Sequence, residues 1–184
     1  MRRSSILFMI TLSTLSSLGV GLLGPVYPIF VVNRFSASLA DVGVLAAVFG
    51  LVAAVFKPPA GRLVDLYGKE KVFFAGVMVG ATCSLSYFFA FDLAQLYIIE
   101  FLFGVSYALQ GPSLLSWMMD ISDKDKRGLF LGMFESVYDI AGAIAALLSV
   151  IIVSRFGFEP LFFMCSGCQA TTGFFILKSR KMSR

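Results

Sequence analysis

Long apolar runs separated by short polar segments are the dominant pattern of this chain. Each of six runs is long enough to cross the hydrocarbon core of a bilayer, which takes about 20 residues of helix. Because a backbone in lipid has to satisfy its own hydrogen bonds, every run is predicted to be helical. The runs cover about residues 6–32, 39–60, 72–91, 93–119, 129–153 and 160–177. The connections are short, so residues 1–184 are predicted to form a single six-helix transmembrane bundle of the all-α membrane class.

The composition agrees with a membrane-embedded chain. Hydrophobic residues make up 58% of it, charged residues only 14%, and the mean hydropathy is +0.88. A soluble domain carries about 25% charged residues, so a water-facing surface is excluded here. There is no His, no nucleophile–base pair and no metal-ligand cluster, so neither an enzyme nor a metal site nor a cofactor is predicted. Basic residues interleaved with aromatics are also missing, which argues against nucleic acid as a partner.

The cysteines do not change this interpretation. Cys165 and Cys168 form a C-x-x-C, a spacing used for metal or redox chemistry in soluble proteins. Here they lie inside an apolar run, as Cys83 does, and no second ligand pair accompanies them. All three are predicted to be packing residues, in line with free Cys behaving as a small hydrophobe.

Basic residues predict the orientation of the bundle. Met1-Arg2-Arg3 is similar to the start of a signal peptide, but the apolar run that follows is longer than a signal core and no cleavage site is evident, so a retained helix is predicted. If the N-terminus is cytoplasmic, the inner segments hold 12 of the 15 cations. The positive-inside rule then places both termini in the cytoplasm. The sequence therefore predicts a multi-pass protein of the inner (plasma) membrane, with the lipid bilayer as a partner. The inner cations are Arg2, Arg3, Arg62, Lys69, Lys71, Lys124, Lys126, Arg127, Lys178, Arg180, Lys181 and Arg184.

A weak internal repeat relates the two halves of the chain. Gly24-Pro25 recurs as Gly111-Pro112, 87 residues later, and Tyr67-Gly68 has a counterpart in Phe156-Gly157 at an offset of 89. Three helices followed by three similar helices must cross the membrane in opposite directions. The bundle is therefore predicted to consist of two inverted three-helix repeats, an architecture used by many secondary transporters.

The segment between the second and third runs carries the sharpest motif. Residues 61–71 read GRLVDLYGKEK. They resemble the motif G-x-L-x-D-[R/K]-x-G-[R/K]-x-[R/K] of the major facilitator superfamily, in the expected loop and on the expected side. Leu66 departs from the pattern, because it stands where the family usually has a cation. The matching positions are Gly61, Leu63, Asp65, Gly68, Lys69 and Lys71.

The motif also makes physical sense by itself. Gly61 lets neighbouring helices approach closely, and Gly68 can take a positive φ in a tight turn. The resemblance implies that Asp65 and Lys69 join Asp120, at the inner end of the fourth run, in a latch that closes the cytoplasmic side in one state. The alternative is a solvated charged segment that includes residues 123–128.

Three acids lie within the predicted spans. By a rise of about 1.5 Å per residue, Asp139 lies roughly 16 Å into its helix, near the bilayer midplane, and Glu100 lies roughly 10 Å from an outer end. Glu135 shares a helix face with Asp139 at i,i+4. No Lys or Arg is expected at their depth, so the acids are easiest to keep in the protonated form. They are candidates for proton coupling or for holding a cationic substrate. For Glu135 the alternative is that it reaches the inner interface.

Two further positions depart from the family. Members often carry an intramembrane Arg four residues before a Gly, whereas Gly104 is preceded at that spacing by Glu100, so an anion-binding site is not supported. Residues 141–146 read AGAIAA and are only poorly similar to the family's antiporter motif. Such small residues are expected to pack helices closely.

Helix breakers and polar aromatics mark a candidate cavity. Glycine and proline residues inside a span leave backbone carbonyls without their helical hydrogen bonds. Polar side chains near these residues are candidates to line a central cavity. The alternative is a packing kink. The breakers are Gly24, Pro25, Pro28, Gly111 and Pro112, and the cavity candidates are Tyr27, Tyr107, Gln110 and Tyr138.

The resemblance covers the whole chain as the N-terminal six-helix half of a superfamily transporter. It implies a half-size secondary transporter, paired with a second copy or with a separate second half. Such a transporter would move a small cationic or lipophilic solute by alternating access, as drug-efflux proteins do, driven by a proton gradient. The alternatives are a symporter for metabolite uptake and a truncated or regulatory fragment that does not transport.

Overall fold

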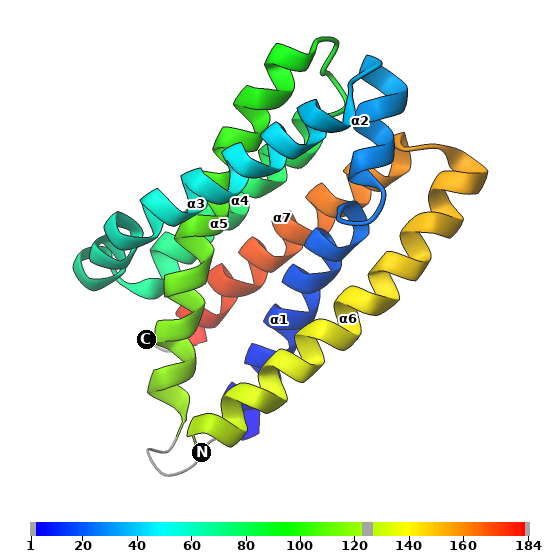
Figure 1. Ribbon diagram of the computed structural model, residues 1–184. Coiled ribbons are helices and arrows are strands. Elements are labelled where there is room, and N and C mark those ends of the chain that lie inside the picture. The colour runs from blue at the N-terminus through cyan, green and yellow to red at the C-terminus, as the bar shows by residue number, and fades with distance from the viewer. Residues whose placement is uncertain (1–2, 123–126, 183–184) are drawn as a thin grey trace.

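Helices account for nearly all of the computed structural model, which describes residues 3–122 and 127–182 (Figure 1). The first span is divided into two helices, α1 and α2, and each of the remaining five spans is one helix. Their bounds are α1 Arg3–Leu23, α2 Tyr27–Phe35, α3 Leu39–Tyr67, α4 Lys69–Ser86, α5 Leu93–Ile121, α6 Arg127–Phe156 and α7 Glu159–Met182.

Four spans of the described chain are long and apolar enough to cross a membrane by length and composition alone. They are residues Ile10–Phe35, Leu39–Tyr67, Leu93–Ile121 and Arg127–Phe156. The helix α4 is not among them, and it has only 18 residues, three of which are the charged Lys69, Glu70 and Lys71. The helix α7 is the other exception.

The helices form an open arc in which each packs mainly on its neighbours. Along the arc α3 packs on α5, α5 on α4, α4 on α7, α7 on α1, and α1 on α6 (Figure 1). The start of α1 and the end of α7 lie at one end of the bundle, and α2 and the α6–α7 connection lie at the other. The edge helices α3 and α6 are the most exposed spans, with only 11% and 17% of their most apolar windows buried.

Two apolar clusters hold the arc together. One lies near α2 and is built on the rings of Phe30, Tyr87 and Phe162. The other lies toward the opposite end and includes Phe73 and Phe134. Since the clusters draw on helices from both halves of the chain, neither three-helix set has a core of its own.

Local sequence explains where α3 begins and ends. Ser38 caps its start: the Ser38 hydroxyl accepts a hydrogen bond from the Asp41 amide at 3.2 Å, and the Asp41 carboxylate accepts one from the Ser38 amide at 2.8 Å. This reciprocal capping box satisfies two otherwise unpaired donors. The helix ends at Gly68, whose φ of +88° is unfavourable for other residues. The positive φ predicted at Gly68 is confirmed.

The first two predicted spans differ most from the structure, and the third ends at Ser86 and not at residue 91. The first span is not one helix over 6–32, because residues 24–26 form a turn and Pro25 cannot donate a helical hydrogen bond. The second does not end at 60. It continues through Pro58 and Pro59 to Tyr67, so most of the motif at 61–71 is helical and only Gly68 lies between α3 and α4.

Some of the predicted helix breakers interrupt a helix in the structure and others do not. Gly24 and Pro25 do interrupt the first span, and Pro28 lies in the first turn of α2, where its missing N–H costs nothing. The prediction was wrong for Gly111 and Pro112, because α5 runs through them without a break. The small residues of 141–146 do pack closely: a Cβ placed on Gly21 of α1 would lie 3.0 Å from the Ala145 Cβ.

Candidate functional site

A cavity of about 210 Å³ lies between α1, α4, α5, α6 and α7. Its lining is largely apolar and aromatic, with Phe73, Phe103 and Phe134 among its walls. The cavity brings together five residues that the sequence predicted and adds three polar ones that it did not. The predicted five are Tyr107, Gln110, Gly111, Glu135 and Tyr138, and the added three are Ser16, Ser106 and Gln169.

The floor of this inner cavity is a partly satisfied polar network. The Ser106 hydroxyl donates to the carbonyl of Gly76 at 2.8 Å and accepts from the Gln110 amide at 3.0 Å. The Ser16 hydroxyl and the Gln169 carbonyl oxygen are buried, yet neither has a hydrogen-bond partner within the described residues. Since buried polar groups are nearly always paired, these two atoms are the unsatisfied part of the polar lining.

Sequence reasoning missed Ser16 and Gln169. The available signal was weak, since both are single uncharged polar residues inside apolar runs. Such residues normally bond within their own helix, as Thr172 does to the Cys168 carbonyl at 2.8 Å. Only the packing of α7 on α1 and α4 shows that Gln169, which is 3% exposed, faces a cavity.

Glu135 and Asp139 line different hollows. Both side chains are exposed along α6, but only Glu135 borders the inner cavity. Asp139 lines a groove of about 400 Å³ between α1 and α6, together with Gly24 and Pro25. Tyr138 borders both hollows, and its backbone carbonyl accepts a hydrogen bond from Ser17 of α1 at 2.5 Å.

Glu100 is separate from both hollows. It is 6% exposed, and its carboxylate accepts a hydrogen bond from the Tyr87 hydroxyl at 2.6 Å. Tyr27 lies beside this pair, with its ring centroid 5.6 Å from that of Tyr87 in an edge-on arrangement. Tyr27 therefore lies with Glu100 and not with the other three cavity candidates.

Replacing Tyr87 with phenylalanine should lower stability. The change removes the hydroxyl that donates to a buried carboxyl group, which costs about 1–3 kcal/mol. Thermal unfolding of the purified protein in detergent measures the loss. Tyr97→Phe is the matched control, because no hydrogen bond of the Tyr97 hydroxyl is found among the described residues. Equal effects of the two changes would show that the bond to Glu100 contributes nothing.

One cation lies deeper than the sequence predicted. The predicted span 39–60 puts Lys57 three residues from its inner end, but α3 runs on to Tyr67. Lys57 is thus ten residues from that end, about 15 Å along the axis. Its ammonium lies 5.1 Å from the centroid of the Tyr107 ring, a distance suited to a cation–π interaction. Lys57 therefore lies beside Tyr107, which borders the inner cavity, and not at the end of its helix.

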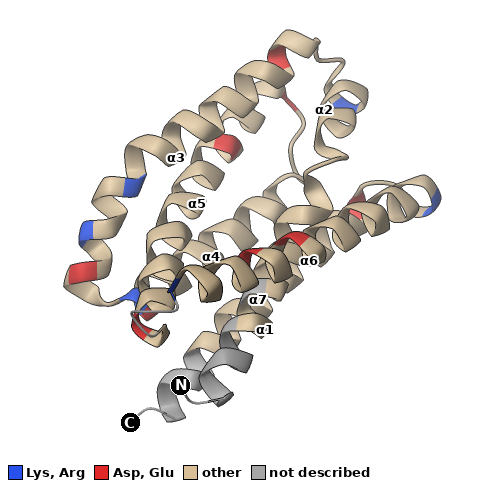
Figure 2. Ribbon diagram, turned by 60° about the horizontal axis from the view of Figure 1, so that its bottom comes forward, with Lys and Arg blue, Asp and Glu red and all other residues tan. Residues whose placement is uncertain are grey.

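Charged residues gather where α3 meets α4 (Figure 2), and ion pairing joins only some of them. Lys69, the first residue of α4, forms an ion pair with Asp120 near the end of α5. Asp65 makes no ion pair within the described residues and lines a shallow hollow with Lys69 and Lys71. Leu63 is exposed, and no atom lies within 4 Å of a Cβ placed on Gly61. The close approach predicted at Gly61 is therefore not found among the described residues, which do not include 123–126.

The Lys69–Asp120 pair should contribute little to folding. Exposed ion pairs are worth about 0.2–1 kcal/mol, and the Asp120 side chain is 60% exposed. A double-mutant cycle with Lys69→Gln and Asp120→Asn should give a coupling energy in that range at low salt, which falls at high salt because of screening. Glu70→Gln is the control. A coupling that does not change with salt would contradict an exposed ion pair.

The Major Facilitator Superfamily family model matches residues 9–180. The chain belongs to this superfamily. Membership points to a multi-pass membrane transporter and away from an enzyme. This superfamily protein thus has two exposed edge helices, α3 and α6, and a cavity that α1, α5 and α6 help to border.

Characterised superfamily proteins resemble the chain over less than half of their own length. The chain is 29% identical to multidrug resistance protein 2 of Bacillus subtilis over 94% of this chain and 44% of that protein. It is 28% identical to the class H tetracycline resistance protein of Pasteurella multocida, over 86% of this chain and 40% of that protein. The crystal structure of PepTSo, a POT family transporter, superposes with a TM-score of 0.81 at 15% identity, covering 98% of this chain and 38% of that one. The last likeness concerns the fold alone.

Proposed function

We propose that this superfamily chain is half of a proton-coupled secondary transporter that moves a small lipophilic cation. The observation that carries this proposal is the inner cavity. Its walls are largely aromatic and apolar, and among the described residues its one carboxylate is that of Glu135. Lys57 is not part of the lining, although its ammonium lies over the ring of Tyr107, which is. Two unpaired oxygens, on Ser16 and Gln169, add acceptors for an N–H or O–H group. The similarity to proteins named for multidrug and tetracycline resistance supports the same class of solute.

The coupling to protons rests on the carboxylates. In this proposal Glu135 holds either the cation or a proton, because one carboxylate cannot neutralise both. Asp139, in the neighbouring groove, exchanges protons with water, and Glu100 keeps its proton while Tyr87 covers it. The driving force is then a proton gradient, and the protein itself needs no cofactor.

An inverted repeat and a cytoplasmic location of both termini complete the proposal. The packing supports the repeat: the contact of α3 with α5 corresponds to that of α6 with α1, and the contact of α4 with α5 to that of α7 with α1. The orientation rests on the positive-inside rule. The Lys69–Asp120 pair then lies on the cytoplasmic side and serves as the latch of that side.

The open arc calls for a partner. The cavity and the groove both adjoin α6, and the Asp139 side chain is exposed in the groove between α1 and α6. A second six-helix unit, either a second copy or a separate half, would cover α3 and α6. A parallel arrangement about an axis along the membrane normal matches the relation between the two halves of full-length superfamily members.

Mass measurement and flux together test the proposal. The mass of the purified protein in nanodiscs distinguishes one copy from two, and a single copy contradicts the homodimer. Radiolabelled tetraphenylphosphonium, a lipophilic cation, is then loaded into proteoliposomes that carry the protein. An imposed pH gradient should drive its movement. A flux that does not change with the pH gradient argues against proton coupling. If tetraphenylphosphonium does not bind, this argues against a cationic solute. Binding without flux points to a fragment that does not transport.

A further inference from the structure

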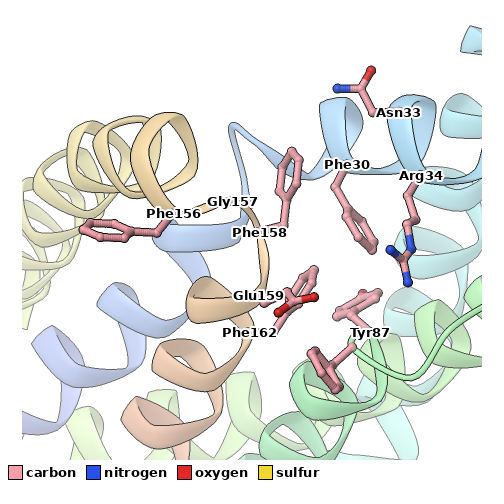
Figure 3. A pocket seen from close by; sticks show the side chains of 10 residues that line it. Phe30, Asn33, Arg34, Tyr87, Phe156, Gly157, Phe158, Glu159 and Phe162 are labelled. Carbon is pink, nitrogen blue, oxygen red and sulfur yellow. The ribbon is translucent and has the colours of Figure 1, made fainter.

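A second pocket, of about 380 Å³, lies at the end of the bundle that contains α2 (Figure 3). Its floor is aromatic and rigidly packed. The ring centroids of Phe30 and Phe162 are 4.9 Å apart, those of Phe30 and Phe158 5.4 Å, and those of Tyr87 and Phe162 5.6 Å. The walls come from three separate segments: α2, the stretch after α4, and the α6–α7 connection. This pocket shares no lining residue with the inner cavity.

Two opposite charges border this pocket without neutralising each other. Arg34 comes from the last turn of α2 and Glu159 is the first residue of α7. Figure 3 shows both side chains among the aromatic rings. Among the described residues the only ion pair is Lys69–Asp120 at the other end. The guanidinium and the carboxylate are therefore both available to a ligand that carries both signs of charge.

Exposed aromatic side chains surround this end of the molecule. Phe89, Phe91 and Phe156 are 63%, 77% and 71% exposed, and Phe156 itself borders the pocket. Large apolar side chains are stable in such positions when acyl chains cover them. The charges of the pocket thus lie beside exposed apolar side chains of the kind that acyl chains can cover.

We propose that this pocket binds the head group of a phospholipid that carries a primary amine. The Arg34 guanidinium takes the phosphate, a pairing that its planar fork of N–H donors favours. The ammonium donates to the Glu159 carboxylate and rests against the aromatic floor, where cation–π attraction adds to the binding. The acyl chains extend over the exposed Phe side chains. A head group without an amine would leave Glu159 unpaired beside the phosphate.

The test compares phospholipids on the purified chain in detergent. Native mass spectrometry measures how much phosphatidylethanolamine and how much phosphatidylglycerol the protein retains. We expect preferential retention of phosphatidylethanolamine. Arg34→Gln and Glu159→Gln should each weaken it about tenfold, the effect of losing a charge-assisted hydrogen bond. Arg155→Gln and Asp92→Asn are the matched controls, because both residues are exposed near the same end and neither borders the pocket.

Each other outcome overturns the assignment. Equal losses of lipid retention in the control variants would show that the effect comes from general surface charge. If phosphatidylglycerol binds as well and Glu159→Gln has no effect, the pocket is a simple anion site. If soluble phosphoethanolamine displaces the lipid at equal concentration, the ligand is a free zwitterion and not a lipid. A variant whose thermal unfolding shows misfolding is replaced by Arg34→Lys or Glu159→Asp, and these should retain part of the preference.

Discussion

Replacing Gly104 with leucine should separate α3 from α5 and cause a large loss of stability. A Cβ at this position would lie 2.8 Å from the backbone carbonyl oxygen of Phe49 and 3.0 Å from Val52. Because the first of these is backbone, the helix itself has to move. Overpacking costs about 1–3 kcal/mol even where side chains can adjust, so we expect at least the upper end of that range. Unfolding in detergent, followed by circular dichroism, measures it.

Gly50→Leu is the matched control for this change. Gly50 lies on α3, near the same contact, but nothing comes within 4 Å of a Cβ placed there. Removing a glycine from a helix interior should instead raise stability by about 0.5–1 kcal/mol. If both substitutions destabilised the chain equally, the close contact between α3 and α5 would not exist in the membrane.

Replacing Glu135 with glutamine should weaken cation binding at least tenfold. The change removes the one carboxylate that borders the inner cavity and leaves the shape of the side chain almost unchanged. Losing a hydrogen bond to a charged group accounts for about a tenfold effect. Equilibrium dialysis with radiolabelled tetraphenylphosphonium measures the affinity of the purified protein.

Two comparisons make the Glu135 result specific. Ser136→Ala alters the adjacent residue, whose hydroxyl bonds to its own helix at the Gly132 carbonyl, and it should leave binding unchanged. Asp139→Asn should also leave binding nearly intact while it reduces the response of flux to pH. Unchanged affinity in Glu135→Gln would exclude this cavity as the cation site.

The positions of the spans could be predicted from sequence because their length is set by the bilayer. The ends of the helices were harder to predict, since breakers act according to context. Pro25 lies in a true turn, whereas Pro112 is carried inside α5. Gly68 was identifiable because the tight connection between α3 and α4 requires a positive φ.

The candidate site could be predicted only in part. Tyr107, Gln110 and Tyr138 were found because polar aromatics and amides near breakers are conspicuous in apolar runs, and all three border the inner cavity. The position of Lys57 along its helix was predicted wrongly because the end of α3 was predicted wrongly. Gln169 was missed since its role depends on the contact of α7 with α1 and α4, which no local pattern reveals.

The order of packing along the arc has a consequence for biosynthesis. The main partners of α1 are α6 and α7, which leave the ribosome after α2 to α5 because synthesis proceeds from the N-terminus. Until then Ser17 has no access to the Tyr138 carbonyl, 121 residues ahead of it. The first span therefore has to wait in the bilayer, or be held by an insertion factor, while α3, α4 and α5 are made. A nascent chain stalled before α6 would present an orphaned first helix to membrane quality control.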